Sequence, residues 1–166
     1  MKRVLLYYIP IVLVALYGLL FFYIKSSTIK QGEIAPDFEA KLIDGTHFKL
    51  SCLRGKYVLL DFWGSWCQPC RAANPNLITL HRQHSNKLDI VTIALEKEVS
   101  AGIAAASKDG FRWKNQIVEQ SNLVLLSETA RKYGITSIPS KFLISPEGKM
   151  LGNMSFEQID SLMLSL

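Results

Sequence analysis

Blocks of hydrophobic and polar residues along the chain predict an α/β domain. The run Tyr57–Trp63 is dense in β-branched and aromatic residues, which is typical of a central strand buried on both faces. Residues 88–95 have the same character and predict a second buried strand. Helices are predicted over residues 68–83, where Pro75 is expected to bend the helix, and over residues 99–108. A strand, a helix and a strand in this order predict a parallel pair joined by a crossover.

Two hairpins are predicted on either side of this unit. The first covers residues 38–50 and turns at Asp44 and Gly45, a dipeptide that suits the positive backbone angles of a tight turn. The second covers residues 141–153 and turns at the tripeptide Pro-Glu-Gly. An antiparallel hairpin joined to a parallel pair makes the predicted sheet mixed.

The remaining elements are short. Residues 115–120 predict a further strand, and Ser127 is expected to cap a helix that ends near Tyr133. Ser155 and Gln158 have the spacing of a capping box, so a last helix is predicted to begin there. Its apolar stripe is expected to pack on the sheet and consists of Phe156, Ile159, Leu162, Met163 and Leu166.

An uncharged apolar segment precedes the domain. Residues 4–24 have no charged side chain, and a helix of this length, at about 1.5 Å per residue, crosses a hydrocarbon core of roughly 30 Å. A cleaved secretory signal is the alternative, but it usually has a shorter apolar region and a small-x-small cleavage site, for which the sequence offers only the weak triplet 26–28. We therefore expect an uncleaved transmembrane anchor over residues 1–25, a linker over 26–34 and one domain over 35–166.

The position of the positive charge argues against a nucleic-acid partner. The net charge is +5, but Lys2, Arg3, Lys25 and Lys30 precede the first acidic residue, so the domain itself is nearly neutral. We expect no nucleic-acid partner and an association with a membrane through the N-terminal helix. Lys2 and Arg3 are opposed by Lys25 and Lys30 on the other flank, so the charges favour a cytoplasmic N-terminus only slightly. With that orientation the domain is expected on the extracytoplasmic side.

Cys67 and Cys70, in the segment WCQPC, carry the candidate catalytic chemistry. Their spacing at a strand-to-helix junction brings the two sulfurs within bonding range, so we expect a Cys67–Cys70 disulfide. Cys67 falls at the helix N-terminus, where unpaired N–H groups and the helix dipole favour the thiolate that attacks a disulfide. Cys70 is expected to be less exposed and to resolve the mixed disulfide. Trp66, Gln68 and Pro69 are expected to tune the stability of the thiolate.

Two other interpretations of the pair are a structural zinc site and a static disulfide. A zinc site needs four ligands, and the rest of the chain offers only Cys52, His47, His81 and His84. A static disulfide across so short a loop restrains little of the unfolded chain. We therefore expect no metal and no cofactor beyond the redox-active cysteines. Cys52 itself is expected to be a small buried side chain, with a regulatory thiol as the alternative.

Asp61 interrupts an otherwise apolar strand shortly before the cysteine pair. A buried carboxylate must find partners or hold a proton. Our hypothesis is that Asp61 relays the proton that leaves Cys70 during exchange. The alternative is an acid at a strand end that reaches water.

These motifs resemble a known family. The hairpin segment APDFEAKLIDGTHFKLSCLRGK precedes DFWGSWCQPC, and SIPSKFLISPEGK follows later, so the chain from about Ile34 onward resembles the TlpA/ResA-like branch of the thioredoxin superfamily. The resemblance implies a thioredoxin-like fold with an N-terminal hairpin extension, and thiol-disulfide oxidoreductase activity on protein dithiols or disulfides. It also implies an anchor in the cytoplasmic membrane, a domain on the extracytoplasmic or periplasmic side, and a membrane electron donor.

The resemblance adds Ile138 and Pro139 to the site. It implies that Pro139 is cis and lies beside the cysteine pair, where the backbone of Ile138 binds the partner peptide as an extra strand. Three positions depart from the family pattern: Ser140 stands where Thr is usual, Lys141 occupies a commonly uncharged position, and Asp61 stands where many members have Asn. The last departure makes the chain more like thioredoxin and favours a reducing role.

The leading hypothesis is therefore a reductant of extracytoplasmic protein disulfides. The resemblance adds the haem-attachment cysteines of apocytochromes as one client class. A disulfide oxidase or isomerase is the first alternative, since the direction depends on differences of about 30 mV that Gln68 and Pro69 do not reveal. A non-catalytic membrane-bound binding module is the second. A peroxidase is not expected, because the peroxidase pattern has Thr at the position of Gly64.

Overall fold

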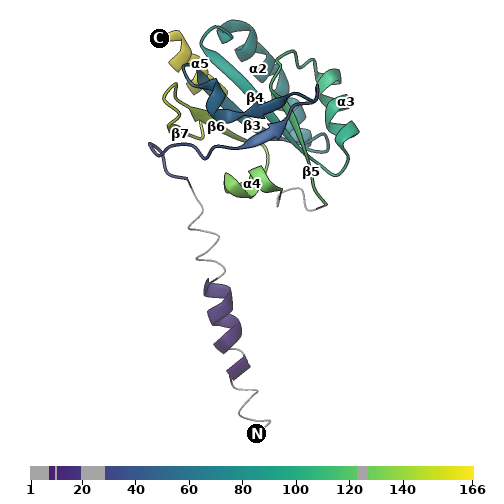
Figure 1. Ribbon diagram of the computed structural model, residues 1–166, viewed down its shortest axis with the longest axis vertical. Helices are drawn as coiled ribbons and strands as arrows, with labels where there is room; N and C mark the ends of the chain where they lie inside the picture. Colours follow the sequence, from purple (N-terminus) through teal and green to yellow (C-terminus); the bar gives the residue numbers. More distant parts are fainter. Residues whose placement is uncertain (1–7, 10, 20–28, 123–126) are drawn as a thin grey trace.

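The computed structural model describes residues 8–9, 11–19, 29–122 and 127–166. A five-stranded sheet forms the centre of the domain (Figure 1). Its strands, in spatial order, are β5 (Gln116–Gln120), β4 (Leu88–Glu96), β3 (Tyr57–Trp63), β6 (Ser140–Ile144) and β7 (Met150–Gly152). β3 pairs parallel with β4 and antiparallel with β6, so the predicted central strand and the mixed sheet are confirmed.

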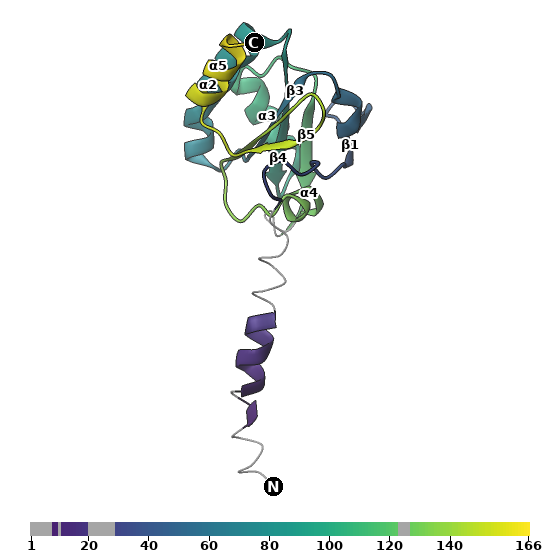
Figure 2. The same ribbon diagram turned by 90° about the vertical axis from the view of Figure 1, so that its left-hand side faces the viewer.

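Different elements cover the two faces of the sheet, as Figure 2 shows with α2 and α5 on one side and β1 on the other. The α-helices of the domain are α2 (Gln68–His84), α3 (Val99–Asp109), α4 (Glu128–Lys132) and α5 (Phe156–Leu164). We call one side the cysteine face, because Leu59 and Trp63 of β3 share a buried cluster there with Cys67 and Cys70 and with apolar residues of α2, α3 and α5. Leu60 and Phe62 point to the opposite face, where they pack with α4 and the N-terminal hairpin.

The N-terminal hairpin is confirmed. β1 (Glu39–Lys41) and β2 (His47–Lys49) pair antiparallel, with Ala40 opposite Phe48. Gly45 has φ +84° in the turn, and the Asp44 carboxylate accepts hydrogen bonds from the N–H and the hydroxyl of Thr46 at 2.9 and 2.7 Å. Gly45 thus has the positive backbone angle that the dipeptide predicts, whereas Asp44 does not and instead holds the turn through its side chain.

Cys52 is exposed, so the prediction of a buried side chain is wrong. It lies in the 3₁₀ turn Leu50–Leu53, where Leu50 takes the buried position and is 1% exposed. A turn this short presents one side to the core. Cys52 therefore lies outside the core as a free thiol.

The cap of α4 also differs from the prediction. Ser127 stands at the N-cap, but its side chain makes no capping hydrogen bond. Glu119 of β5 takes that role, because it accepts the N–H of Thr129 and the hydroxyl of Ser127, both at 2.8 Å. The helix start is therefore fixed by a neighbouring strand and not by the local sequence.

The C-terminal helix α5 packs as predicted except at its last residue. Its capping box is present, and Ile159 and Met163 are fully buried. Leu166 lies beyond the helix end and is 59% exposed, so it does not join the apolar stripe.

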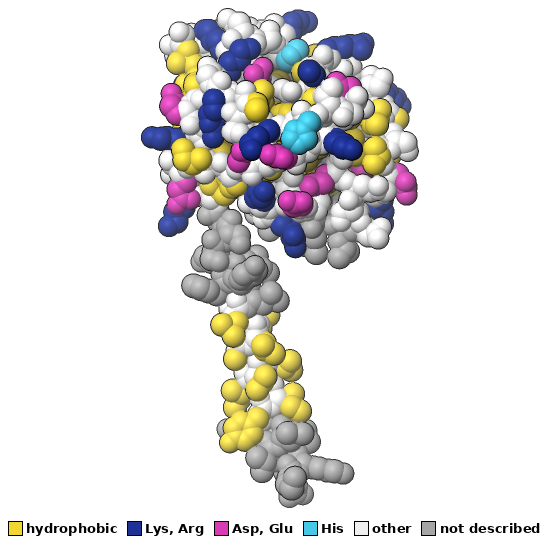
Figure 3. All heavy atoms as spheres, in the orientation of Figure 1, with side chains coloured by type: hydrophobic (Ala, Val, Ile, Leu, Met, Phe, Trp, Pro, Cys, Tyr) yellow, Lys and Arg dark blue, Asp and Glu magenta, His cyan; other side chains and the backbone are white. Residues whose placement is uncertain are grey.

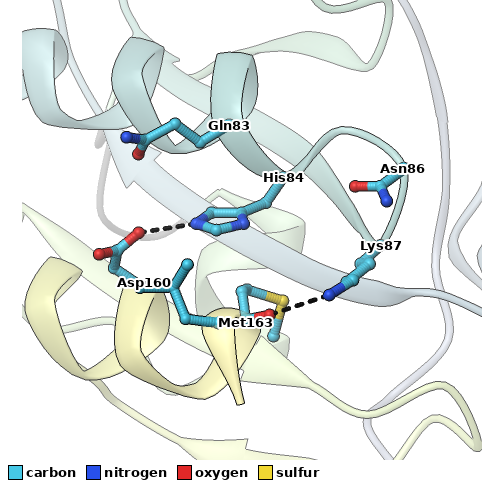
Figure 4. Close-up of a pocket in the computed structure, with 7 residues that line it drawn as sticks. Gln83, His84, Asn86, Lys87, Asp160 and Met163 are labelled. Carbon is cyan, nitrogen blue, oxygen red and sulfur yellow. Dashed lines mark hydrogen bonds and ion pairs between the residues drawn. The ribbon is translucent and has the colours of Figure 1, made fainter. Parts of the chain in front are cut away.

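A polar contact holds α5 to α2. His84, near the end of α2, is 5% exposed, and its Nε2 lies 2.6 Å from Asp160 of α5 (Figure 4). Lys87 extends this contact by donating a hydrogen bond to the carbonyl of Met163 at 3.2 Å. His81, three residues earlier, instead packs its ring on Trp113 with centroids 5.3 Å apart. The two histidines therefore serve two separate packing contacts.

Much of the predicted anchor over residues 1–25 lies outside the described residues. Residues 11–19 form a helix whose apolar side chains are exposed, with Val14 at 71% (Figure 3). Within the described ranges, none of the helices has both the length and the apolar character that crossing a bilayer requires.

Candidate active site

Cys67 and Cys70 form a disulfide at the start of α2, with their Cα atoms 5.3 Å apart. Cys67 is the N-cap residue, and its Sγ accepts the N–H of Cys70 at 3.2 Å. Pro69 lies in the first turn, where a missing N–H costs nothing. Cys67 is 5% exposed and Cys70 1%, which agrees with the predicted difference. The sulfur of Cys67 therefore lies at the positive end of the helix dipole, next to a backbone donor.

The loop before Cys67 is tied to the end of β4. Glu96 is 2% exposed and accepts hydrogen bonds from the backbone N–H of Ser65 and, at 2.9 Å, from its hydroxyl. The indole Nε1 of Trp66 donates to the carbonyl of Leu95 at 2.9 Å. These three hydrogen bonds fix the approach of the chain to the nucleophile. Trp66 is nevertheless 54% exposed, and Gln68 and Pro69 are exposed, so the segment around Cys67 faces solvent.

Gly64 is required at its position by close packing. A Cβ added there would lie 2.8 Å from Nε1 of Trp66 and 3.3 Å from Cδ1 of Ile138. Distances this short leave no room for a side chain at position 64, including the Thr of the peroxidase pattern. Gly64 also shows that Ile138 reaches the loop that leads to the cysteine pair.

The peptide bond between Ile138 and Pro139 is cis, as the family resemblance implied. Ile138 packs against both buried clusters, including the one that contains the cysteines. Ser140, at the start of β6, donates its hydroxyl to the carbonyl of Ser137 at 2.7 Å. The fold thus brings residues 137–140 next to the cysteine loop, although the two segments are far apart in the sequence.

Arg71 joins the first turn of α2 to the end of α3. Its guanidinium forms a two-point ion pair with the carboxylate of Asp109, which also accepts a hydrogen bond from Asn74 at 2.6 Å. Burial acts to raise the pKa of Asp109, but these hydrogen bonds and the charge of Arg71 together hold it below its usual value. The ion pair therefore anchors the helix turn that carries both cysteines.

Asp61 is buried on the cysteine face. Side chains alternate along a strand, so Asp61 points to the same side as Leu59 and Trp63. Its exposed fraction is 4%, which contradicts the alternative of an acid that reaches water. Burial raises the pKa of Asp61 to about 7, and the charge of Lys141 acts against that rise. The carboxyl group therefore changes its protonation near neutral pH.

Three members of the site were not predicted from the sequence: Glu96, Arg71 and Asp109. Glu96 carried a usable signal, because an acid at the end of a buried parallel strand lies at the sheet edge where α2 begins. No such signal marked Arg71 and Asp109 in the sequence, because each looks like an ordinary charged residue near a helix end.

Comparisons with known proteins show which family the chain belongs to. A family model described as the AhpC/TSA family matches residues 31–151. Thioredoxin-like protein YneN of Bacillus subtilis (strain 168) is 39% identical over 69 residues, covering 42% of this chain and 41% of YneN. Thiol-disulfide oxidoreductase ResA of the same strain is 30% identical over 128 residues, covering 75% of this chain and 66% of ResA. The chain thus spans less than two thirds of either relative.

A solved structure of a thiol-disulfide oxidoreductase from Bacteroides fragilis NCTC 9343 is similar in fold. It superposes with a TM-score of 0.71 at 31% identity and covers 81% of this chain and 100% of that chain. The predicted thioredoxin-like fold is therefore confirmed. The chain belongs to the AhpC/TSA family and, within it, to the thioredoxin-fold thiol-disulfide oxidoreductases that resemble ResA.

Proposed function

We propose that the chain reduces disulfides of client proteins through Cys67 and Cys70. The observation that carries this proposal is the cysteine disulfide at the N-terminus of α2, with the less buried cysteine at the N-cap. A helix N-terminus favours a thiolate at Cys67 once the pair is reduced.

The reaction proceeds in two exchange steps. The Cys67 thiolate attacks one sulfur of the client disulfide, so a mixed disulfide forms and the second client sulfur leaves as a thiolate that takes up a proton. Asp61 then accepts the proton of Cys70, and the Cys70 thiolate attacks the sulfur of Cys67. The client sulfur leaves Cys67 as a thiolate and takes up the proton from Asp61, so the client is released as a dithiol and the Cys67–Cys70 disulfide is restored. Two electrons pass from the cysteine pair to the client, and no organic cofactor takes part.

The client is held beside the pair by the segment that contains Ile138 and Pro139. In this proposal the client chain pairs with the backbone of Ile138 as an added strand. This pairing aligns the client's cysteine with Cys67. Trp66, Gln68 and Pro69 tune the thiolate and border the contact.

We further propose where the reaction takes place. Residues 1–25 anchor the chain in the cytoplasmic membrane, residues 26–34 form the linker, and the domain faces the extracytoplasmic side. A membrane protein supplies the electrons, and the cysteine pairs of apocytochromes are among the clients. The basic residues before the apolar segment and the resemblance to the TlpA/ResA-like branch support this placement.

Disulfide reduction by the full-length chain tests the chemistry. With dithiothreitol as electron source, the chain should accelerate the reduction of insulin, and Cys67→Ser should abolish the acceleration. Cys70→Ser should accumulate a mixed disulfide through Cys67, visible as a mass increase that dithiothreitol removes. Cys52→Ser is the matched control and should keep full activity. Insulin reduction that persists in Cys67→Ser would contradict the proposal.

The direction of exchange is tested by the reduction potential of the pair. A reductant is expected to equilibrate near about −270 mV, as thioredoxin does, whereas a strong oxidant equilibrates near about −120 mV. Titration of the full-length chain against glutathione or dithiothreitol buffers, read by thiol labelling of Cys67, measures this potential. A value near the oxidant's would favour the oxidase alternative.

A further inference from the structure

Lys141 lies directly opposite Asp61 in the antiparallel pair of β6 and β3. Directly opposed residues of such a pair project to the same face, with Cβ atoms about 4.5–5.5 Å apart. The pair Leu59 and Leu143, two positions along, belongs to the buried cluster that contains the cysteines. Lys141 and Asp61 therefore share the cysteine face.

The ammonium group of Lys141 is positioned by α5. Its Nζ lies 4.6 Å from the centroid of the Phe156 ring, which is a cation–π contact. Phe156 packs against the cysteine cluster, and both side chains are half-buried. A charge held in this way is screened less by salt than one on an exposed chain.

The other charged groups around this face have partners of their own. Arg71 of α2 pairs with Asp109 of α3, His84 of α2 pairs with Asp160 of α5, and Glu96 of β4 accepts two hydrogen bonds from Ser65. Glu157 of α5 accepts a hydrogen bond from Ser155, which is the main cause of its lowered pKa. The charge of Lys141 lowers the same pKa by a smaller amount. Across the described part of the chain, no carboxylate lies within ion-pair distance of Lys141. Asp61 is not within that distance either, so the charge of Lys141 acts on Asp61 across the strand pair and not through a direct ion pair.

We propose that Lys141 is a positioning residue for the exchange reaction: from the strand position opposite Asp61, with its ammonium group held over Phe156, it acts on the carboxylate that accepts the proton of Cys70. This inference rests on the proposed function and adds a residue outside the cysteine motif. The step that it controls is the transfer of a proton from the Cys70 thiol to the Asp61 carboxylate. The resulting Cys70 thiolate then attacks Cys67 and releases the client.

The pH dependence of client reduction tests this role. The charge of Lys141 opposes protonation of Asp61, so Lys141→Met should move the midpoint of the rising limb of the pH–rate profile upward by about 0.5–1 pH unit. Met keeps an unbranched side chain of similar length next to Phe156. Lys141→Arg retains the charge and should keep the midpoint of the parent chain. In an Asp61→Asn background, Lys141→Met should cause no shift.

Lys149→Met is the matched charge control. Lys149 precedes β7 in the same hairpin and is exposed, so its removal lowers the net charge without changing the surroundings of Asp61. The control should leave the midpoint in place. Equal midpoints for Lys141→Met and the parent chain, with both active, would overturn the inference.

A second measurement separates this inference from the proposed function. Titration of the Asp61 carboxyl carbon by ¹³C NMR reports the effect of Lys141 even if the chain reduces no client. An unchanged titration in Lys141→Met, or in Lys141→Gln if Met is not tolerated, would refute the role of Lys141. Failure of the function alone would appear as an inactive parent chain whose Asp61 titration still responds to Lys141.

Discussion

Glu96 at the end of β4 accepts hydrogen bonds from both the backbone N–H and the hydroxyl of Ser65. The two residues are 31 positions apart in the sequence, yet their contact determines the path of the loop that enters Cys67. The carboxylate is buried, and across the described part of the chain the two donors of Ser65 make no hydrogen bond to another acceptor.

Glu96→Ala is expected to lower the free energy of unfolding by about 1–3 kcal/mol, because it leaves two donors of Ser65 without an acceptor. Urea unfolding of the oxidised chain measures the change. Glu98→Ala is the matched control: Glu98 is exposed and makes no capping hydrogen bond, so a change within about 0.5 kcal/mol is expected. Glu96→Gln retains an acceptor and should recover part of the loss. Equal stabilities for Glu96→Ala and Glu98→Ala would show that the contact contributes nothing.

Asp61→Asn is expected to stabilise the oxidised fold at high pH. Burial raises the pKa of Asp61 from 3.8 to about 7, so folding favours the protonated form. The stability from this group is complete below the unfolded pKa and is lost as the pH rises through about 7. Asparagine is neutral throughout, so its advantage should grow between about pH 4 and about pH 7 and level off above about pH 8, at an upper limit of roughly 4 kcal/mol.

Urea unfolding across that pH range measures the difference. Asp89→Asn on the neighbouring strand is the control, because the Asp89 side chain is 28% exposed and pairs with Lys56. A stability difference for Asp61→Asn that does not change with pH would contradict the burial of an ionisable carboxyl group at this position.

His84→Ala is expected to destabilise the fold by about 2–4 kcal/mol, because it removes a buried ring and leaves Asp160 without its partner on α2. Arg82→Ala, on the exposed side of the same helix, should change stability by less than about 0.5 kcal/mol. Thermal or urea unfolding compares the two. A loss that is equally small in both variants would mean that α5 is held to α2 by its apolar residues alone.

Cys52 is expected to react with Ellman's reagent in the native oxidised chain. It is exposed, whereas Cys67 and Cys70 are bonded to each other, so one thiol per chain should titrate without denaturant. Cys52→Ser should titrate none before reduction. A reaction that requires denaturant would show that Cys52 is buried, as its residue type suggested.

Local sequence was sufficient for most elements. The apolar runs of β3 and β4 are dense enough to specify buried strands, and both hairpins turn where Gly and Asp or Pro favour the required backbone angles. The capping box of Ser155 and Gln158 formed as predicted, because both partners lie within one helical turn. The helix N-cap at Cys67 follows from the same local rules, and with it the nucleophile and its resolving partner.

The wrong predictions concern positions where residues remote in the sequence determine the exposure or the hydrogen bonds of a side chain. The exposure of Cys52 depends on which side of a short turn faces the core, and the cap of α4 comes from Glu119 on another strand. Residue type predicts an average environment, whereas these two outcomes depend on the particular packing of one fold.

By itself, the sequence determined the α/β class, the order of the elements and the cysteine pair at a helix N-terminus, because these depend on contacts within a few residues. Only the tertiary structure decided what surrounds that pair. These contacts are the hydrogen bonds of Ser65 to Glu96, the ion pair of Arg71 with Asp109, and the position of Lys141 opposite Asp61. Each of these contacts joins two elements, and it exists only once strand register and helix packing bring them together. The same packing removes water from Asp61, and this loss of solvation raises the pKa of its carboxyl group to about 7.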